Sequence, residues 1–319
     1  MKTIGLLEIF KKYAIFFVMV GLIILFSLLT PYFLTMQNLT NVFVQNSYVI
    51  IAAVGLSFIM ISGGMDLSIG YQMSLVGIVT STLMKNVGLP VAVCLIIGMA
   101  LGILLGLFNG LMAIILKVHP LIVTLGTMTI FQGISYIISN SKSILNLPKS
   151  FKFIGQGYLF GFLPVSVILM ILIVAIATII LDKTYVGRFI YALGSNEEAA
   201  HLAGIDVKKL KLFVFALCGF FVSIATIILF ARTGSGASST GPGTEFTCMT
   251  AAVLGGISFK GGEGKMWGVV VGVLILGILS NGMQLINMST YVQYVVKGFV
   301  LLAAVGFDTY QRESAVTAK

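Results

Sequence analysis

Long apolar runs separated by short polar segments make up most of the chain. A helix needs about 20 apolar residues to cross the hydrocarbon core of a bilayer, and most of these runs approach that length. The pattern predicts an all-α polytopic membrane protein with about 10 transmembrane helices. The expected spans cover residues 13–30, 44–62, 71–84, 90–116, 121–139, 163–181, 212–231, 246–257, 266–283 and 291–307. The run at 246–257 is short for a full crossing, which indicates a tilted or partly re-entrant helix.

Composition supports this class of protein. The mean hydropathy is +1.10, and only 9% of the residues are charged, which no soluble domain of this length would tolerate on its surface. We expect one transmembrane domain over residues 1–319, with no room for a separate ATPase or soluble binding domain. The cysteines lie in apolar runs without metal-like spacing, so we expect neither a disulfide framework nor a metal site. They are Cys94, Cys218 and Cys248.

The basic residues set the expected orientation. With the N- and C-termini in the cytoplasm, thirteen of the nineteen basic residues fall in cytoplasmic segments and five in outer segments, in agreement with the positive-inside rule. The cytoplasmic set is Lys2, Lys11, Lys12, Lys117, Lys183, Arg188, Lys208, Lys209, Lys211, Lys260, Lys265, Arg312 and Lys319. The outer set is Lys85, Lys142, Lys149, Lys152 and Arg232. The net charge of +9 is therefore mainly an orientation signal and predicts no nucleic-acid partner.

The longest polar interval, the 182–211 loop, lies between two expected spans. Ser195 followed by Glu198 is typical of a capping box, which predicts a short helix over residues 196–203. Gly204 suits a left-handed residue at the end of that helix, and Asp206 can cap the next one. A short helix closed at both ends favours a platform for a partner. The alternative is a solvated loop whose helix only completes the connection.

Two glycine-rich segments interrupt the helical pattern. The first, Gly-Gly-Met-Asp-Leu-Ser-Ile-Gly at 63–70, predicts a break in which Asp66 either caps a helix at the inner surface or lies beside a transport path. The second, at 234–245, includes Glu245, which we interpret as a helix cap or as an outer contact for a delivery protein. Paired breaks of this kind would fit an inverted repeat.

A third glycine-rich segment, at 255–265, does not form a phosphate-binding loop. A Walker motif needs a glycine five residues before Gly264 and a hydroxyl residue after the following lysine, whereas Phe259 and Met266 stand there. The chain is therefore not expected to hydrolyse ATP. Nor does any grouping of serine, histidine and acidic residues indicate catalysis, so we predict a protein that is not an enzyme.

Polar residues within the expected spans are candidates for a transport path. Amides and hydroxyls of this kind suit a neutral polar solute, although most are expected to form hydrogen bonds between helices. Thr124 and Thr127 are three residues apart and should share a helix face, as should Asn281 and Gln284. With Asp66, the candidates are Gln45, Asn46, Asn109, Thr124, Thr127, Gln132, Asn281 and Gln284. Lys297 also falls within a span and can extend its ammonium to the outer surface.

The 182–211 loop also carries a family resemblance. Glu198-Ala199-Ala200, followed after three residues by Gly204, resembles the E-A-A-x-x-x-G loop by which permease subunits of ATP-binding-cassette (ABC) importers engage their ATPase. The wider run at 187–205 is similar more narrowly to ribose-type sugar permeases, as are residues 63–70, 120–127 and 250–308. The general loop continues with a proline, whereas no proline follows Gly204 before Pro242, a departure that ribose-type permeases share.

The resemblance implies the permease subunit of a bacterial ribose-type importer in the inner membrane. It implies a second permease copy or a paralogue, two ABC ATPase subunits and an extracytoplasmic sugar-binding protein, all working by alternating access. ATP and magnesium would be bound by the ATPase, with no cofactor on this chain. The residues implied for ATPase contact are Gly187, Arg188, Gly194, Ser195, Asn196, Glu197, Glu198, Ala199, Ala200 and Gly204.

Two other classes of membrane protein compete with this one. A gradient-driven secondary transporter of a small polar solute would need acidic residues buried near the middle of the membrane. Asp66, Glu245 and Glu263 fall near the ends of the expected spans, which argues against that class. An integral membrane enzyme would need catalytic groups clustered at one surface, and the sequence indicates none.

Overall fold

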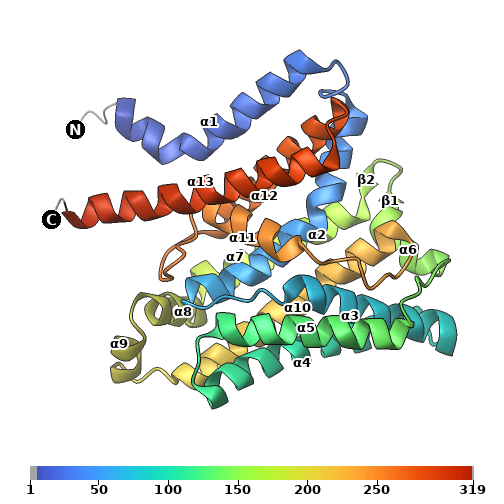
Figure 1. Cartoon of the computed structure of the whole chain (residues 1–319), viewed down its shortest axis with the longest axis horizontal. Helices are drawn as coiled ribbons and strands as arrows, with labels where there is room; N and C mark the ends of the chain where they lie inside the picture. The colour runs from blue at the N-terminus through green and yellow to red at the C-terminus, as the bar shows by residue number, and fades with distance from the viewer. Residues whose placement is uncertain (1–5, 318–319) are drawn as a thin grey trace.

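The computed structural model describes residues 6–317, and the side chains of residues 15–306. Helices make up nearly all of the regular structure in this range (Figure 1). Their bounds are α1 Leu6–Leu29, α2 Met36–Ile61, α3 Ile69–Thr82, η1 Leu83–Val87, α4 Val91–Leu116, α5 Pro120–Ser139, α6 Lys149–Gln156, α7 Val165–Lys183, α8 Tyr185–Ser195, α9 Glu197–Leu202, α10 Val207–Thr233, α11 Thr244–Leu254, α12 Met266–Leu285 and α13 Thr290–Thr317. A short antiparallel hairpin, β1 (Tyr158–Leu159) with β2 (Leu163–Pro164), precedes α7.

Six helices of the described chain are long and apolar enough to cross a membrane, namely α2, α4, α5, α7, α10 and α12. Shorter apolar stretches lie in α1 (Ile15–Leu29), α11 and α13 (Thr290–Gly306). The prediction of an all-α polytopic membrane protein is confirmed. Of the basic residues used to orient the chain, those at 2, 11, 12, 312 and 319 lie outside the described side chains.

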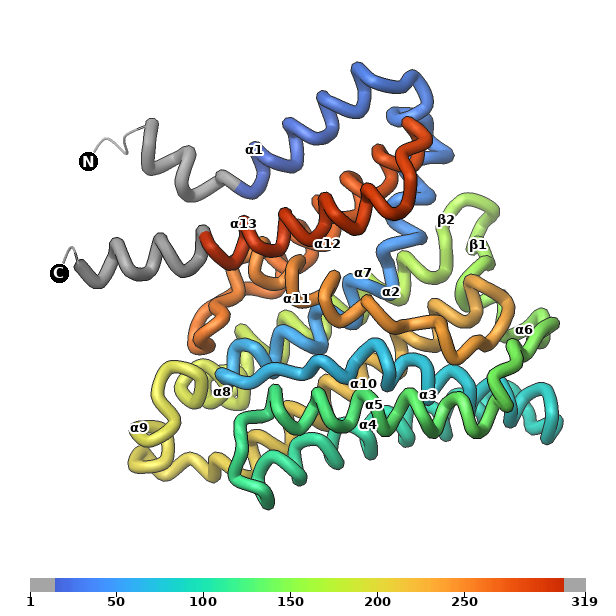
Figure 2. The backbone as a smooth tube through the Cα atoms, in the orientation of Figure 1, coloured from blue at the N-terminus to red at the C-terminus, as the bar shows by residue number. Residues whose placement is uncertain are grey.

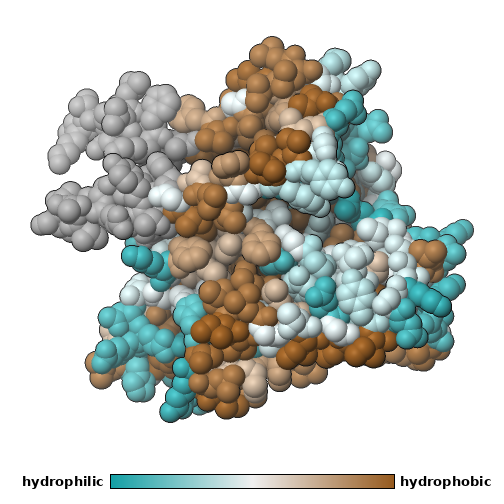
Figure 3. All heavy atoms as spheres, viewed as in Figure 1, coloured by the Kyte–Doolittle hydropathy of each residue, from teal (hydrophilic) through white to brown (hydrophobic). Residues whose placement is uncertain are grey.

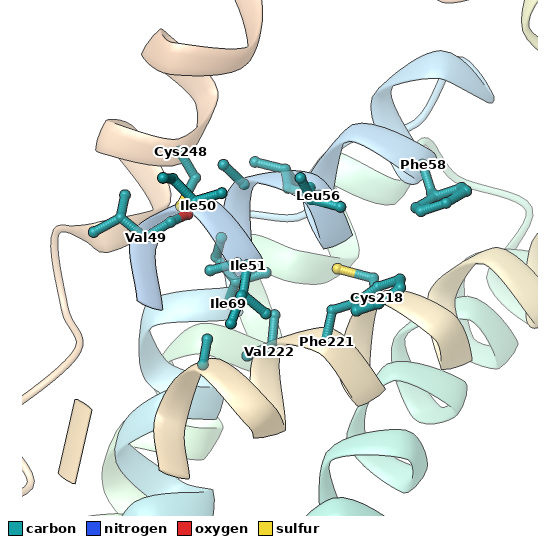
Figure 4. Close-up of a cluster of buried hydrophobic side chains, with 14 of the residues drawn as sticks. Val49, Ile50, Ile51, Leu56, Phe58, Ile69, Cys218, Phe221, Val222 and Cys248 are labelled. Carbon is teal, nitrogen blue, oxygen red and sulfur yellow. Dashed lines mark hydrogen bonds between the residues drawn. The ribbon is translucent and has the colours of Figure 1, made fainter. Parts of the chain in front are cut away.

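The central helices are α2 and α10. Side chains of α2 from Val49 to Ile61 are buried throughout, which explains why its sequence shows no polar face. Figure 4 shows these side chains meeting Cys218 and Phe221 of α10, Ile69 of α3 and Cys248 of α11. All three cysteines are free and buried, and they pack in this part of the chain as small apolar residues.

The α4–α10 contact is built on a row of glycines. Gly98, Gly102, Gly106 and Gly110 recur every four residues of α4; the first lies against Thr80 of α3, and the other three lie against α10. A Cβ at Gly102 would overlap the carbonyl of Gly219 on α10, and a Cβ at Gly106 would overlap that of Phe215. The two backbones therefore touch without side chains between them, as is common where membrane helices associate.

Both predicted breaks are present, and both are folded into the interior. The chain leaves α2 at Ile61 and resumes in α3 at Ile69, and it leaves α10 at Thr233 and resumes in α11 at Thr244. Figure 2 shows the two connecting segments running inward from opposite ends of the bundle. Irregular backbone at this depth persists only where the protein supplies its hydrogen bonds. Here the Leu67 N–H donates to Thr124 Oγ1 (3.2 Å), and Ile144 and Gly236 exchange backbone hydrogen bonds.

The surface fits a membrane environment. In Figure 3 apolar surface runs along the middle of the molecule, while hydrophilic surface gathers at its two ends, over α8 and α9 and over the region of α6. Much of the outward face of α4 consists of large exposed apolar side chains, including Ile96, Leu104 and Ile115. In a membrane such side chains would contact lipid.

Replacing Gly106 by leucine should separate α4 from α10, because the new side chain has no room against the Phe215 carbonyl. We expect a loss of stability on the order of 1–3 kcal/mol, seen as a lower thermal unfolding midpoint of the purified protein in detergent. Gly126→Leu on α5 is the matched control, since a Cβ there meets nothing within 4 Å. Equal midpoints for the two variants would contradict this account of the contact.

Candidate functional site

A buried polar cluster fixes the break between α2 and α3. We define the Asp66 cluster as Asp66, Ser68, Gln72 and Asn109, whose side chains are all buried. The Ser68 N–H and hydroxyl donate to Asp66 Oδ1 at 2.7 and 2.6 Å. The side-chain amides of Gln72 and Asn109 donate to Oδ2 at 3.1 and 3.2 Å, and both also donate to Ser68 Oγ. The cluster therefore ties the break and the start of α3 to α4.

The position of Asp66 corrects the interpretation of this residue as a cap at the inner surface. Its side chain is 1% exposed, because the chain folds back into the bundle after α2 instead of ending at the surface. Four donors surround the carboxylate, which offsets the cost of burying it. The amide oxygens of Gln72 and Asn109 point away from the carboxylate and are buried without a partner within the described chain.

The second break meets the first beside this cluster. The Ser74 hydroxyl of α3 donates to the carbonyl of Thr240 (2.8 Å), and Gly70 packs directly against the Glu245 side chain. Both carboxylate oxygens of Glu245 accept the Gly243 N–H (3.0 Å), as expected for a helix cap. The side chain is only 2% exposed, so the interpretation of Glu245 as an outer contact for a delivery protein is wrong for this structure.

A cavity of about 600 Å³, here called the α2–α13 cavity, lies between α2, α11, α12 and α13. It brings together three residues predicted from the sequence: Gln45, Asn46 and Asn281. Asn281 also exchanges two hydrogen bonds of 2.9 Å with Asn38 of α2. The side-chain amide of Asn281 is therefore already hydrogen-bonded to the protein. Asn281 contributes to the shape of the cavity wall and offers few free donors to a solute.

The other predicted path residues lie elsewhere. Asn109 belongs to the Asp66 cluster. Thr124 Oγ1 accepts the backbone N–H of Leu67 in the break, and Thr127 lies beside Thr124 on the buried face of α5. Gln132 lines neither of the two cavities described here. Asn281 and Gln284 lie three residues apart on α12, as predicted, but Gln284 is exposed and does not line the cavity.

Two basic residues also line the α2–α13 cavity, and of these only Lys297 was among the polar residues that the sequence placed within a span. The guanidinium of Arg232 lies over the Tyr48 ring, 5.6 Å from its centroid, and its Nε is buried without a hydrogen-bond partner within the described chain. Lys297 also lines the cavity, where the sequence analysis expected it to reach the outer surface. Hydroxyls of α11 and α12, from Thr247, Thr250 and Ser280, complete the polar lining.

The 182–211 loop contains two helices instead of one. α8 is capped by Thr184, whose Oγ1 accepts the Gly187 N–H (3.3 Å), and it extends through Ser195. The predicted capping box is therefore wrong: the Ser195 hydroxyl donates to the Tyr191 carbonyl, and Asn196 caps α9 by accepting the Ala199 N–H (2.9 Å).

The predicted end of α9 and start of α10 are confirmed. Gly204 has a left-handed φ of +87°, and Asp206 accepts the Lys209 N–H at 3.1 Å. That N–H and the nearby Lys209 ammonium hold the pKa of the Asp206 carboxyl below its ordinary range. The cap therefore persists at neutral pH and weakens only on acidification.

α8 is attached directly to the break after α2. The Gly262 N–H of the 255–265 segment donates to the Ile61 carbonyl (2.8 Å), and Gly194 sits so close to both groups that a Cβ there would overlap them. The Tyr191 hydroxyl adds a hydrogen bond to the Gly264 carbonyl (2.7 Å). Movement of α8 would therefore reach the segment that holds Asp66.

Exposure divides the residues implied for ATPase contact into two groups. Gly187 is buried against the end of α7, Gly194 is half-buried, and Ala200 is 3% exposed. Ala200 therefore faces the protein and offers no surface to a partner. The exposed members are Arg188, Ser195, Asn196, Glu197, Glu198, Ala199 and Gly204. Leu202, which the sequence analysis did not single out, is the last residue of α9 and is 81% exposed.

The broken helices, the interior polar cluster and the cavity define a multi-pass membrane permease. Residues 38–305 match the family described as branched-chain amino acid transport system / permease component. The chain belongs to this family. No solved structure matches the chain.

Several curated relatives are similar over nearly their whole length. The L-arabinose transport system permease of Escherichia coli is 39% identical, covering 97% of this chain and 94% of the relative. The D-allose transport system permease of E. coli is 37% identical, covering 93% and 91%. The ribose import permease of Haemophilus influenzae is 36% identical, covering 92% of each. Together with the six apolar helices, this similarity identifies a multi-pass inner-membrane protein.

Replacing Asn109 by leucine should destabilise the protein by about 1–3 kcal/mol, because Asp66 Oδ2 and Ser68 Oγ each lose a donor inside the bundle. Thermal unfolding of the purified protein in detergent measures the effect. Gln132→Leu is the control, since within the described residues its backbone carbonyl accepts the Ser135 hydroxyl and its side chain makes no hydrogen bond. A midpoint for Asn109→Leu at or above that of the control would contradict the role assigned to the Asp66 cluster.

Proposed function

We propose that this chain is the membrane permease subunit of an ABC importer for a monosaccharide of the ribose, allose or arabinose kind. The observation that carries the proposal is the similarity, along more than nine-tenths of the chain, to permeases named for those three sugars. The subunit itself is non-catalytic. ATP and magnesium are bound by a separate ATPase, and an extracytoplasmic binding protein delivers the sugar.

The proposed topology has ten spans with both termini in the cytoplasm. It adds α1, α3, α11 and α13 to the six long apolar helices. What supports it is that α3 and α11 are short helices that follow interior breaks, so each completes a crossing begun by an irregular segment. The hydrogen bond from Ser74 of α3 to Thr240 of the break before α11 suits an inverted repeat whose two halves meet at the centre.

The α2–α13 cavity is the proposed part of the sugar path in this subunit. Its polar lining consists mainly of amides and hydroxyls, which hydrogen-bond to a neutral polyol, and Tyr48 and Tyr294 offer aromatic faces. The two cations, Arg232 and Lys297, act as hydrogen-bond donors to sugar hydroxyls and disfavour cationic solutes. A second permease copy would enclose the path from the other side.

α9 is the proposed coupling helix. An ATPase seated on its exposed face would move α8, and the contacts of Gly194 and Tyr191 would pass the movement to the α2–α3 break. Leu202 and the exposed residues beside it form the contact, while Ala200 anchors α9 to the permease.

Leu202→Glu should weaken the ATPase contact. We expect a separate ATPase to co-purify with the tagged native protein in mild detergent, and its yield to fall at least fivefold with the variant, because a charge replaces an exposed apolar contact. Quantitative mass spectrometry of the purified material measures the yield. Leu145→Glu is the matched control, since Leu145 is also a strongly exposed leucine, but lies between α5 and α6.

The two possible failures have different meanings. If no ATPase appears with the native chain in several mild detergents, the importer proposal fails and a gradient-driven transporter becomes the better account. If the ATPase binds both variants equally, the importer proposal stands but α9 is not where the ATPase binds. Asp66 and Glu245 are buried inside the protein, so their positions no longer argue against a gradient-driven transporter. The co-purification experiment and the similarity to importer permeases therefore separate the ABC importer from the gradient-driven transporter.

Gln45→Leu should reduce sugar uptake while leaving ATPase co-purification intact, because it removes a cavity-lining amide from an exposed position. We expect at least a threefold loss in the initial rate of radiolabelled ribose, allose or arabinose uptake into cells, for whichever of them the native protein carries. Gln284→Leu is the control, as an exposed glutamine outside the cavity. Equal rates for both variants would exclude Gln45 from the path.

A further inference from the structure

A second cavity, of about 460 Å³, lies at the end of the molecule occupied by α9. We call it the basic cavity. Its walls come from the turn between α4 and α5, the first turns of α10, the start of the α2–α3 break and one side chain of α9. The charged and titratable side chains that line it are Lys117, His119, Glu197, Lys208 and Lys211.

Positive charge in the basic cavity exceeds negative charge. Lys211 forms an ion pair with Glu197, with its Nζ 2.7 and 2.8 Å from the two carboxylate oxygens. Lys117 and Lys208 have no ion-pair partner within the described residues. The other nearby carboxylate, Asp206, pairs with Lys209 and also attracts Lys208, but it does not line the cavity. Two lysines therefore remain to bind an anion.

Other donors point to the same kind of ligand. His119 Nδ1 accepts the Leu121 N–H (3.3 Å), which leaves Nε2 of the neutral ring as a donor. α5 begins at the cavity, and the positive end of its helix dipole adds to the attraction for an anion. A phosphate group would satisfy this set of donors.

The apolar surroundings indicate where the phosphate comes from. Lys117 directly follows Ile115 and Leu116, which are 58% and 59% exposed, and Ile122 on the first turn of α5 is 61% exposed. The basic cavity thus lies at the end of an apolar strip on α4 and α5, and Figure 3 shows hydrophilic surface at the α9 end adjoining apolar surface. Free phosphate would make no use of that strip, whereas the acyl chains of a phospholipid would cover it.

We propose that the basic cavity binds the headgroup of an anionic phospholipid. Lys117 and Lys208 pair with the phosphate, His119 donates a hydrogen bond, and the acyl chains lie along α4 and α5. Basic pockets between membrane helices bind anionic headgroups by this combination of charge and apolar contact. Because Gly63 of the break and Glu197 of α9 also line the cavity, the bound headgroup touches both segments that the ATPase contact would move.

Native mass spectrometry of the full chain, with its co-purifying subunits, tests the proposal. The protein in detergent is titrated with phosphatidylglycerol and, separately, with phosphatidylcholine of the same acyl chains. The double variant Lys117→Gln/Lys208→Gln should bind phosphatidylglycerol about tenfold more weakly than the native protein. The control Lys142→Gln/Lys149→Gln, which removes one exposed lysine between α5 and α6 and another at the first residue of α6, should bind it as the native protein does.

Further arms identify the ligand and the cause. The charge-preserving variant Lys117→Arg/Lys208→Arg should retain native affinity, and a loss equal to that of the glutamine variant would overturn the proposal. So would equal binding of phosphatidylglycerol to the glutamine variant and its control, or equal affinity for the two lipids. Displacement of phosphatidylglycerol by millimolar inorganic phosphate or glycerol 3-phosphate would identify a free-phosphate site instead. Binding seen only after the co-purifying subunits are stripped away would assign the cavity to a protein interface.

Discussion

The hydrogen bonds around Asp66 are the constraint on which the rest of the structure depends. Where the chain leaves helical geometry inside a membrane protein, no water is available to bond its unpaired backbone N–H and C=O groups. These groups must therefore form hydrogen bonds with other parts of the protein. Ser68, Gln72 and Asn109 do this for the carboxylate, and Thr124 does it for the backbone. α3, α4 and α5 are placed where they can make these bonds, which is why this half of the molecule packs around the break.

The same break connects the two regions to which we assign function. On one side, α3 packs against Thr240 and against Glu245 of α11, a helix that forms a wall of the α2–α13 cavity. On the other side, the Ile61 carbonyl is held by Gly262, with Gly194 of α8 against both. A force on α9 and a solute in the cavity would therefore act on one segment of irregular backbone. This arrangement gives alternating access a physical route that needs no long chain of flexible side chains.

The sequence predicted features whose cause is local and missed those whose cause is tertiary. Long apolar runs, the glycine break and the end of α9 at Gly204 follow from hydropathy and backbone conformation alone. α2, in contrast, begins at Met36, well before the predicted residue 44. Thr35 caps this earlier start, and the Asn38 side-chain amide donates a hydrogen bond to Asn281 of α12. Ser195 and Asn196 are both competent caps, and the packing of α8 through Ile190 and Leu193 selects the second. The burial of Ala200 and the position of Arg232 in the cavity depend on residues distant in the sequence. A local sequence pattern carries no information about such contacts.

The glycine row on α4 has a mechanical consequence. Helices separated by side chains can slide, because rotamers rearrange as they move, whereas two backbones in direct contact have nothing between them to rearrange. α4 and α10 should therefore move as one stiff beam, and α10 alone is about 40 Å long at 1.5 Å per residue. One end of that beam starts at the 182–211 loop, and the other ends where the chain turns toward α11. A small tilt applied at the first end becomes a displacement at the second, so the permease can relay motion across the membrane by leverage while its interior keeps its packing.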